Sequence, residues 1–221
     1  MQRHFDEELN DLKNDILKMG AFAQEAIFNS IEALKNRDKV LAKKIIDNDK
    51  RVDELELVID EKCIDLIARH QPLASDLRFI TTGMKINAEL ERITDIAVDI
   101  SERVIEIADK PLLKPLVDIP KLTRIAQDMV KMSIDSFVNR DIEAAKSVLL
   151  LDSEADNLRN IISKELIEDY MVKDGTVSPR AVPLLLIARF LERICDHATN
   201  IAEDIIYMVE AKVVKHHPEK L

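Results

Sequence analysis

Two short acidic segments carry the residues best suited to chemistry. Residues 89–100 read ELERITDIAVDI, and residues 191–201 read LERICDHATNI. Each places Glu and Asp four residues apart, as Glu91/Asp95 and Glu192/Asp196. Residues four apart lie on the same face of a helix, so each segment would present two carboxylates together. Clustered carboxylate oxygens suit hard or borderline cations such as Mg²⁺, Mn²⁺, Ca²⁺ or iron.

The acidic segments belong to a longer internal repeat. Residues 36–38 read NRD and recur at 139–141, a shift of 103 residues that also superimposes Asp49 and Asp53 on Asp152 and Asp156. A shift of 101 residues superimposes Glu91 and Asp95 on Glu192 and Asp196. The chain therefore reads as a tandem duplication of roughly 100 residues, too long for a solenoid repeat and suited to a small helical bundle.

Three helices are expected in each half. Apolar residues recur at helical spacing over 3–35, 38–68 and a third segment after the break HQPLA at 70–74, where Ser75 is a candidate N-cap. In the second half, Asp174-Gly175 predicts a turn, and Ser178 a helix N-cap. Pro111, Pro115 and Pro120 mark the linker. The predicted fold is all-α, a tandem duplication of two antiparallel three-helix bundles with six long helices, spanning residues 1–110 and 120–212.

Folding each hairpin places the acids at common levels. If the first turn centres near residue 72, Asp49 lies level with Asp95, and Asp53 with Glu91. A turn near residue 174 likewise sets Asp152 level with Asp196, and Asp156 with Glu192. Each half would thus gather four carboxylates at one height along two neighbouring helices.

Metal binding and a plain solvated surface both remain open on this pattern. Two like charges four apart on an exposed helix cost only ~0.2–0.5 kcal/mol, so a folded protein tolerates them without a ligand. Yet the duplication retained these acids while Glu56 and Asp60 became Arg159 and Ser163. Asp99 became Asn200, which still offers an oxygen, so both are candidate metal ligands. His197 is either an accessory ligand or a partly exposed helix residue.

Composition excludes several classes of protein. A net charge of −10 argues against a nucleic-acid binder, which needs a basic surface. Two distant cysteines and a charged N-terminus favour a reduced, cytoplasmic location, and the longest uncharged apolar run, AVPLLLIA at 181–188, is too short to span a membrane. The chain lacks a P-loop, GxGxxG, GxSxG and HExxH, so we expect no enzyme and no catalytic residues.

These motifs together resemble one known family. The segments RHQPLASDLR at 69–78, LERITD at 90–95 and LERICDHATNIAE at 191–203 resemble those of PhoU proteins, phosphate-signalling regulators of bacteria and archaea. The resemblance covers nearly the full length. The first half departs from the family pattern at Thr94, where Gly is usual, and at Asp99, where Asn is usual.

The resemblance implies both a cofactor and partners. It implies multinuclear metal clusters, iron above all, with zinc, manganese or magnesium as alternatives, held by Asp49/Asp53 with Glu91/Asp95 and by Asp152/Asp156 with Glu192/Asp196. It also implies a homodimer that acts with the ATPase subunit of a phosphate ABC transporter and with a sensor histidine kinase. Membrane association would come only through those partners. The family represses phosphate-starvation genes and limits phosphate uptake.

Two other functions compete with this expectation. One is a helical interaction module, such as a chaperone cofactor, whose acidic faces bind no metal. The other is a metal-dependent hydrolase, which would need open coordination positions and a general base.

Overall fold

Long α-helices make up nearly all of the computed structural model, which describes residues 2–212. Four helices form the first half: α1 (Gln2–Asn36), α2 (Lys39–Asn48), α3 (Lys50–His70) and α4 (Ala74–Ile107). The second half holds α5 (Asp118–Asn139), α6 (Ile142–Lys164) and α7 (Ser178–Glu210), with a π-helical segment Glu165–Met171 and a 3₁₀ turn Gly175–Val177 between α6 and α7. The described residues include no strand, which confirms the all-α prediction.

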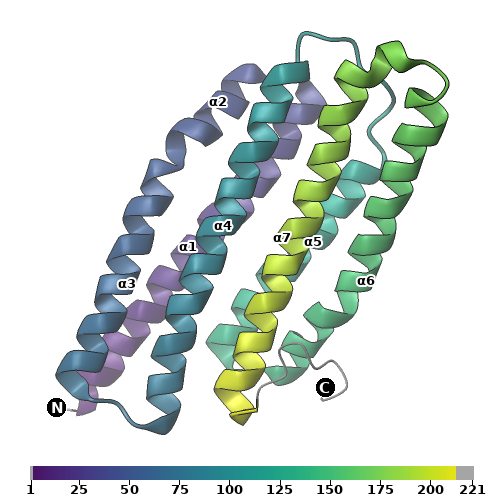
Figure 1. Cartoon of the computed structure of the whole chain (residues 1–221). Coiled ribbons are helices and arrows are strands. Elements are labelled where there is room, and N and C mark those ends of the chain that lie inside the picture. The colour runs from purple at the N-terminus through teal and green to yellow at the C-terminus, as the bar shows by residue number, and fades with distance from the viewer. Residues whose placement is uncertain (1, 213–221) are drawn as a thin grey trace.

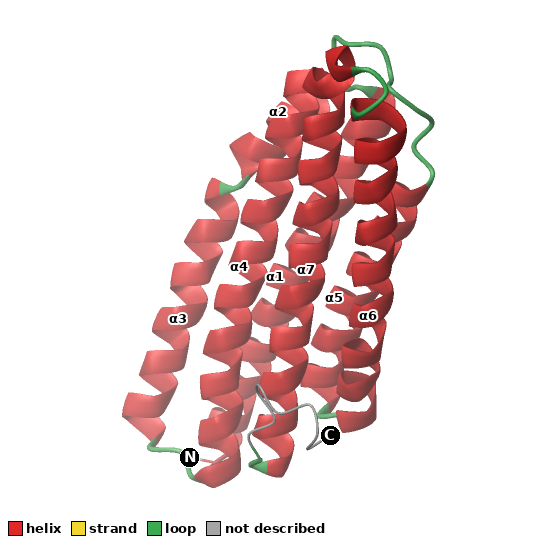
Figure 2. Cartoon of the chain, turned by 45° about the vertical axis from the view of Figure 1, so that its right-hand side comes forward, coloured by secondary structure: helices red, strands yellow, loops and turns green. Residues whose placement is uncertain are grey.

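The helices form two bundles that lie side by side (Figure 1). The first bundle is α1, α4 and the consecutive pair α2–α3, and the second is α5, α6 and α7. Figure 2 shows that all the long helices run along one common direction. The predicted second helix is present but is interrupted at Asp49, where α2 ends and α3 begins.

The repeated NRD motif proves to be a helix–helix turn. Arg37 and Arg140 both adopt the left-handed conformation, with φ of 54° and 55°. The next residue caps the following helix: Asp38 accepts hydrogen bonds from Val40 N and Leu41 N, as an N-cap carboxylate does. Asp141 caps α6 in the same way. Both halves thus keep the same helix C-terminus and the same N-cap of the next helix.

Two predicted helix N-caps are wrong. The N-cap of α4 is Leu73, and Ser75 lies inside the first turn, where its Oγ donates to Asp76 Oδ1. The N-cap of α7 is Val177 rather than Ser178, whose Oγ donates to the carbonyl of Gly175. The predicted turn at Asp174-Gly175 is present, because the Asp174 carboxylate accepts a hydrogen bond from Thr176 N.

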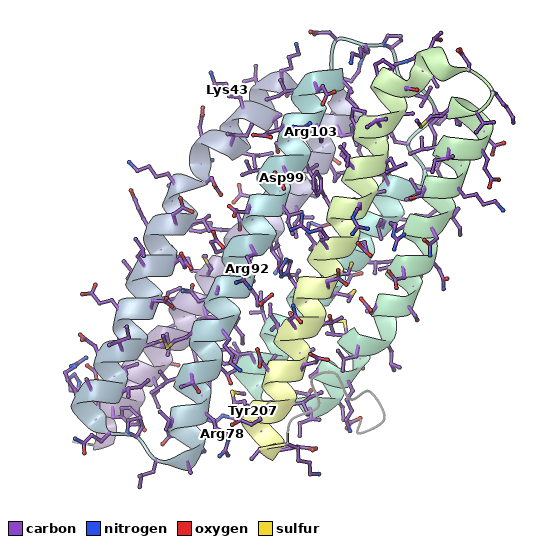
Figure 3. All side chains as sticks on the ribbon, viewed as in Figure 1. Lys43, Arg78, Arg92, Asp99, Arg103 and Tyr207 are labelled. Atoms are coloured by element: carbon purple, nitrogen blue, oxygen red, sulfur yellow. The ribbon has the colours of Figure 1, made fainter. Side chains whose placement is uncertain are left out.

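The halves meet mainly along α4 and α7, which pack antiparallel (Figure 1). Arg78 Nε donates to the carbonyl of Met208 at 3.0 Å, and Lys85 Nζ lies 2.8 Å from Asp204 Oδ1. Arg78 and Tyr207 lie close together at this lower end of the pair (Figure 3). At the opposite end, Lys110 Nζ donates to the carbonyl of Pro179. The pairing therefore extends along most of both helices.

One continuous hydrophobic core joins the two halves. Phe79 of α4 stacks on Phe137 of α5 with ring centroids 4.7 Å apart. A Cβ on Gly20 would lie 2.2 Å from Ile134 Cδ1, so only glycine lets α1 approach α5 this closely without rearrangement of Ile134. This shared core holds the positions of the four helices that carry the acidic motifs.

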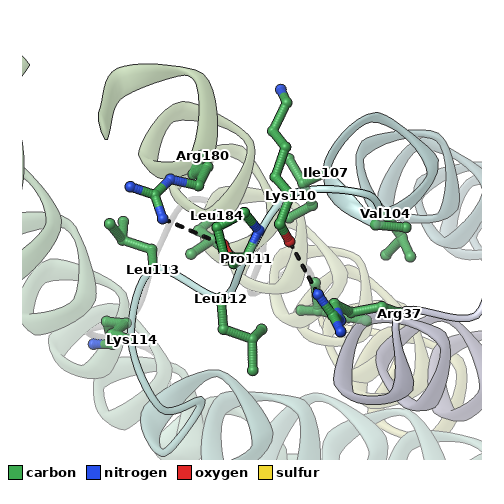
Figure 4. A pocket seen from close by; sticks show the side chains of 12 residues that line it. Arg37, Val104, Ile107, Lys110, Pro111, Leu112, Leu113, Lys114, Arg180 and Leu184 are labelled. Carbon is green, nitrogen blue, oxygen red and sulfur yellow. Dashed lines mark hydrogen bonds between the residues drawn. The ribbon is translucent and has the colours of Figure 1, made fainter. Parts of the chain in front are cut away.

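The linker between α4 and α5 closes one end of the molecule. Arg37 Nη1 donates to the carbonyl of Lys110, and Arg180 Nη1 donates to that of Pro111 (Figure 4). These bonds tie the linker to both halves. Within residues 2–212, no helix combines the length and the apolar composition needed to cross a membrane.

Candidate metal centres

The hairpin formed by α3 and α4 has the predicted register. Asn87 Nδ2 donates to the carbonyl of Glu56 at 2.9 Å and to Asp60 Oδ1 at 3.1 Å. The residue numbers of these pairs sum to about 144, as a turn centred near residue 72 requires. The register brings together Asp49, Asp53, Glu91 and Asp95, which we call the first acidic cluster.

Asp49 lies at a special point of the backbone. It is the single residue between α2 and α3, and its carbonyl accepts from Val52 N at 2.7 Å, an i→i+3 contact that tightens the turn. Its Oδ1 is buried and has no hydrogen-bond partner. A buried carboxylate oxygen without a partner is costly, so this atom favours the approach of a proton or a cation.

The carboxylates of the first acidic cluster interact electrostatically. Partial burial, followed by the charges of Asp95 and Asp53, raises the pKa of Asp49 to about 6. Partial burial and then the charge of Asp95 raise the pKa of Glu91 to about 7. Burial also raises the pKa of Asp95, with the Asp53 charge as the next cause. The charges of Asp53 and Asp95 are therefore close enough to oppose the ionisation of Asp49 and Glu91.

A matching group forms on α6 and α7. Asp152, Asp156, Glu192 and Asp196, which we call the second acidic cluster, occupy the equivalent positions. Loss of solvent, followed by the charges of Glu192, Asp152 and Asp156, raises the pKa of Asp196 to about 6. Burial and the charge of Asp156 raise the pKa of Asp152. The acids of the second half therefore also lie close enough to interact electrostatically.

An arginine distinguishes the second acidic cluster. Arg159 Nη2 lies 3.1 Å from Glu192 Oε1 and 3.8 Å from Asp156 Oδ1. The equivalent residue of the first half is Glu56. Burial, followed by the charges of Asp60 and Asp53, raises the pKa of that carboxyl. One cluster is thus extended by an acid and the other is partly neutralised by a base.

A pocket accompanies the first acidic cluster. It has a volume of about 210 Å³ and is lined by residues of α1, α2, α3 and α4, among them Ala26, Asn29, Asn48, Asp49 and Thr94. The equivalent positions in the second half are Met129, Met132, Leu151, Asp152 and Cys195. At the first three of these positions the second half therefore has larger, apolar side chains.

The remaining predicted residues lie apart from the cluster centres. Asp99 lies one turn beyond Asp95 and contributes to raising the pKa of Asp95. Asn200 instead faces the other half, where its Nδ2 donates to Glu89 Oε2 at 3.3 Å. His197 Nδ1 lies 2.6 Å from the same oxygen, so in this structure it pairs across the α4–α7 interface and is only partly exposed.

The acids of the two clusters supply the oxygen donors that a hard cation prefers, but they do not lie close enough together to bind one. No three His, Cys, Asp or Glu side chains in the described part of the chain converge closely enough to hold one ion. Like-charged carboxylates repel one another, and a bound cation would offset that repulsion. The all-oxygen donor set and the unpartnered Asp49 Oδ1 fit Mg²⁺, Mn²⁺ or iron best in the first acidic cluster.

Some residues around the clusters escaped the sequence reasoning. Asn87 sets the α3–α4 register, and Glu89 joins the two halves, but neither repeats in the second half, where Ala188 and Phe190 are equivalent. The acids were identified because they recur in both halves, and Asn87 and Glu89 do not recur, so the repeat could not identify them. Arg159 was noted in the sequence only as the replacement of Glu56. Because it follows Asp156 by three residues, helical spacing could have placed it on the same face of α6 as Asp156.

Comparisons with known proteins identify the family. The PhoU domain family matches residues 16–104 and again residues 119–205. The chain is 41% identical over 209 residues to the phosphate-specific transport system accessory protein PhoU homolog of Aquifex aeolicus, covering 95% of this chain and 94% of that protein. It is 34% identical to phosphate-specific transport system accessory protein PhoU of Escherichia coli K12, covering 96% and 88%.

A solved structure agrees with these sequence relatives. The crystal structure of PhoU from Pseudomonas aeruginosa superimposes with a TM-score of 0.89 at 33% sequence identity, covering 94% of this chain and 100% of that one. Two family domains, near full-length relatives and the same fold lead to one conclusion: the chain belongs to the PhoU family.

Proposed function

We propose that this protein is an accessory protein of a phosphate-specific transport system that limits phosphate uptake and represses the phosphate-starvation response. The observation that carries the proposal is the near full-length match to relatives named as accessory proteins of that system. The acidic clusters consist of carboxylate side chains, which suit a regulatory protein that binds cations. The two cysteines are buried, and burial raises the pKa of the Cys63 thiol to about 12.

The acidic clusters give this role a physical basis. Asp49, Asp53, Glu91 and Asp95 would hold cations in the first half, and Asp152, Asp156, Glu192 and Asp196 would hold them in the second. A bound metal would supply concentrated positive charge on an otherwise acidic surface. Asp53, Asp95, Asp156 and Asp196 are exposed, so a partner protein could contact that charge directly.

Two partners suit such an adaptor: the ATPase subunit of the phosphate ABC transporter and a sensor histidine kinase, both reached from the cytoplasm. A second copy of this chain is a further expected partner. The adaptor can shift the activity of either partner only by binding one of its states more tightly than another. Regulation therefore requires that its affinity for a partner change with phosphate supply.

The test combines metal content with partner binding. The protein is purified without chelator, its metals are measured by elemental analysis, and its affinity for each purified partner is measured with and without phosphate. We expect bound metal and a phosphate-dependent change in affinity for at least one partner. Light scattering on the same sample tests the dimer.

Three results would contradict parts of the proposal. Binding that is identical with and without phosphate for both partners would refute the regulatory role. A protein that is free of metal and takes none up would leave only a helical interaction module. Hydrolysis of phosphoesters with added Mn²⁺ would show an enzyme instead.

A further inference from the structure

Arg159 is a cation built into the second acidic cluster. Its Nη2 lies 3.1 Å from Glu192 Oε1, and Glu192 is one of the few buried acidic side chains in the described structure. The Arg159 side chain itself is 26% exposed, and its Nη1 donates to Asn160 Oδ1 at 2.7 Å. The guanidinium therefore stands between the buried carboxylate and the surface.

Its hydrogen bonds are incomplete. Arg159 Nε is buried and has no hydrogen-bond partner. A buried donor without an acceptor destabilises the inward position of the side chain, and a long arginine can expose its head while its stem stays packed. The exposed Asn160 amide already holds one end of the guanidinium at the surface. The side chain thus has an outward alternative.

The same position of the first half shows the opposite charge. Glu56 is equivalent to Arg159, and its carboxyl interacts with Asp53 and Asp95 of the first acidic cluster. Exchanging an acid for a base changes the local charge by two. The first acidic cluster has an unpartnered oxygen at Asp49, whereas Glu192 in the second has a partner. The two clusters therefore differ in their need for an added cation.

We propose that Arg159 is the resident cation of the second acidic cluster and must move outward before a divalent metal binds there. This inference rests on the proposed metal binding. A guanidinium and a metal ion compete for the same lone pairs of Glu192, and they repel each other at short range. The first acidic cluster then takes up metal first, and the second takes it up more weakly.

The experiment isolates the second acidic cluster. Asp53→Asn with Glu91→Gln silences the first cluster, and Mn²⁺ is titrated into this background while free Mn²⁺ is followed by electron paramagnetic resonance. Arg159→Glu is then added, which gives the second half the residue type of the first. Lys173→Glu makes the same charge change at the far end of the hairpin, where Lys173 pairs with Asp169.

We expect Arg159→Glu to tighten Mn²⁺ binding about tenfold or more, because it removes one positive charge and adds a ligand. Lys173→Glu should change it by less than about twofold, because that site is exposed and screened. Arg159→Gln, which removes only the charge, should lie between. Circular dichroism and thermal unfolding check that each variant folds, and Arg159→Gln replaces Arg159→Glu if the latter does not.

The outcomes separate the two claims. Unchanged or weaker Mn²⁺ binding in folded Arg159→Gln and Arg159→Glu would overturn the role of Arg159 while leaving metal binding intact. An equal effect of Lys173→Glu would reduce it to a general charge effect and would also overturn it. Absence of Mn²⁺ binding in the wild-type protein and in every variant would contradict the proposed metal binding itself.

Discussion

The two acidic clusters share their carboxylates but differ in what surrounds them. In the first, Glu56 adds negative charge, and an open pocket adjoins Asp49. In the second, Arg159 adds positive charge, and Met129 and Leu151 occupy positions equivalent to the pocket lining. The duplication therefore conserved the oxygen donors between the halves while their electrostatic environment changed.

The two clusters stabilise their closely spaced carboxylates in different ways. A partly buried carboxylate is destabilised unless it is protonated, paired with a base or bound to a metal. The second acidic cluster uses a base, the guanidinium of Arg159. In the first, no base among the described residues contributes to the pKa of Asp49 or Glu91, so the cluster depends on protons or on an added cation.

Removing the carboxylates of each cluster in turn should have the largest effect on Mn²⁺ affinity. Asp53→Asn with Glu91→Gln should weaken the tightest Mn²⁺ binding by about a hundredfold or more, since loss of even indirect metal contacts costs 10–100-fold. Asp156→Asn with Glu192→Gln should remove only a weaker binding phase. Both double variants are titrated with Mn²⁺ beside the wild-type protein. If the second pair removed the tight phase, the proposed order of loading would be reversed.

One substitution made in both halves should change stability in opposite directions. Glu192→Gln leaves Arg159 partly buried without its charged partner, so we expect it to lower the free energy of unfolding by about 1–3 kcal/mol. Glu91→Gln removes a carboxylate that is repelled by Asp95, so we expect a rise of up to about 1 kcal/mol. Urea unfolding at pH 7.5 in EDTA measures both. A loss of stability in both variants would show that the first acidic cluster is not repulsive.

Stability without metal should fall as the pH rises. Partial burial and the neighbouring carboxylates raise the pKa of Asp49 from its ordinary 3.8 to about 6, and the pKa of Glu91 from 4.5 to about 7. Between those values the folded protein binds more protons than the unfolded chain, so its stability declines from about pH 4 to pH 7. After discounting for solvent screening we expect a loss of about 1–2 kcal/mol.

Urea unfolding in EDTA between pH 5 and pH 7.5 measures this loss. Asp49→Asn with Glu91→Gln should reduce the dependence of the free energy of unfolding on pH. Asp196→Asn measures how much the second acidic cluster contributes to that dependence. Mn²⁺ added at pH 7.5 should restore stability in the wild-type protein. A slope that persists unchanged in the first double variant would assign the pH dependence to other groups.

The sequence predicted the level of the acids because that level depends only on helix pitch and turn position. The predicted turns near residues 72 and 174 were accurate enough to pair Asp49 with Asp95 and Asp152 with Asp196. The interruption at Asp49 could not be predicted in this way, because its backbone angles remain helical and no glycine or proline marks it. Asn200 was misleading for another reason: its face of α7 meets α4, a contact that only tertiary packing decides.

Asn87 is a last difference between the halves, and its removal should have the smallest effect. It is fully buried between α3 and α4, where the second half has Ala188. Asn87→Ala loses two hydrogen bonds to Glu56 and Asp60 but also removes an unpaired Oδ1, so the two terms partly cancel. We therefore expect a loss of about 1 kcal/mol. Urea unfolding measures it, with Asn10→Ala on the exposed face of α1 as a control expected within about 0.5 kcal/mol of wild type.

The same variant tests whether register and metal binding are connected. Asn87 of α4 donates a hydrogen bond to the carbonyl of Glu56 in α3, so its loss should weaken the packing of α3 on α4. Amide hydrogen exchange should then increase more in α3 than in α6. Mn²⁺ affinity at the first acidic cluster should then fall only a few-fold, since the helices are still aligned by the core that Ile59 and Leu90 share. A larger fall than that produced by removing Asp53 would mean that the hairpin register, rather than the carboxylates, limits binding.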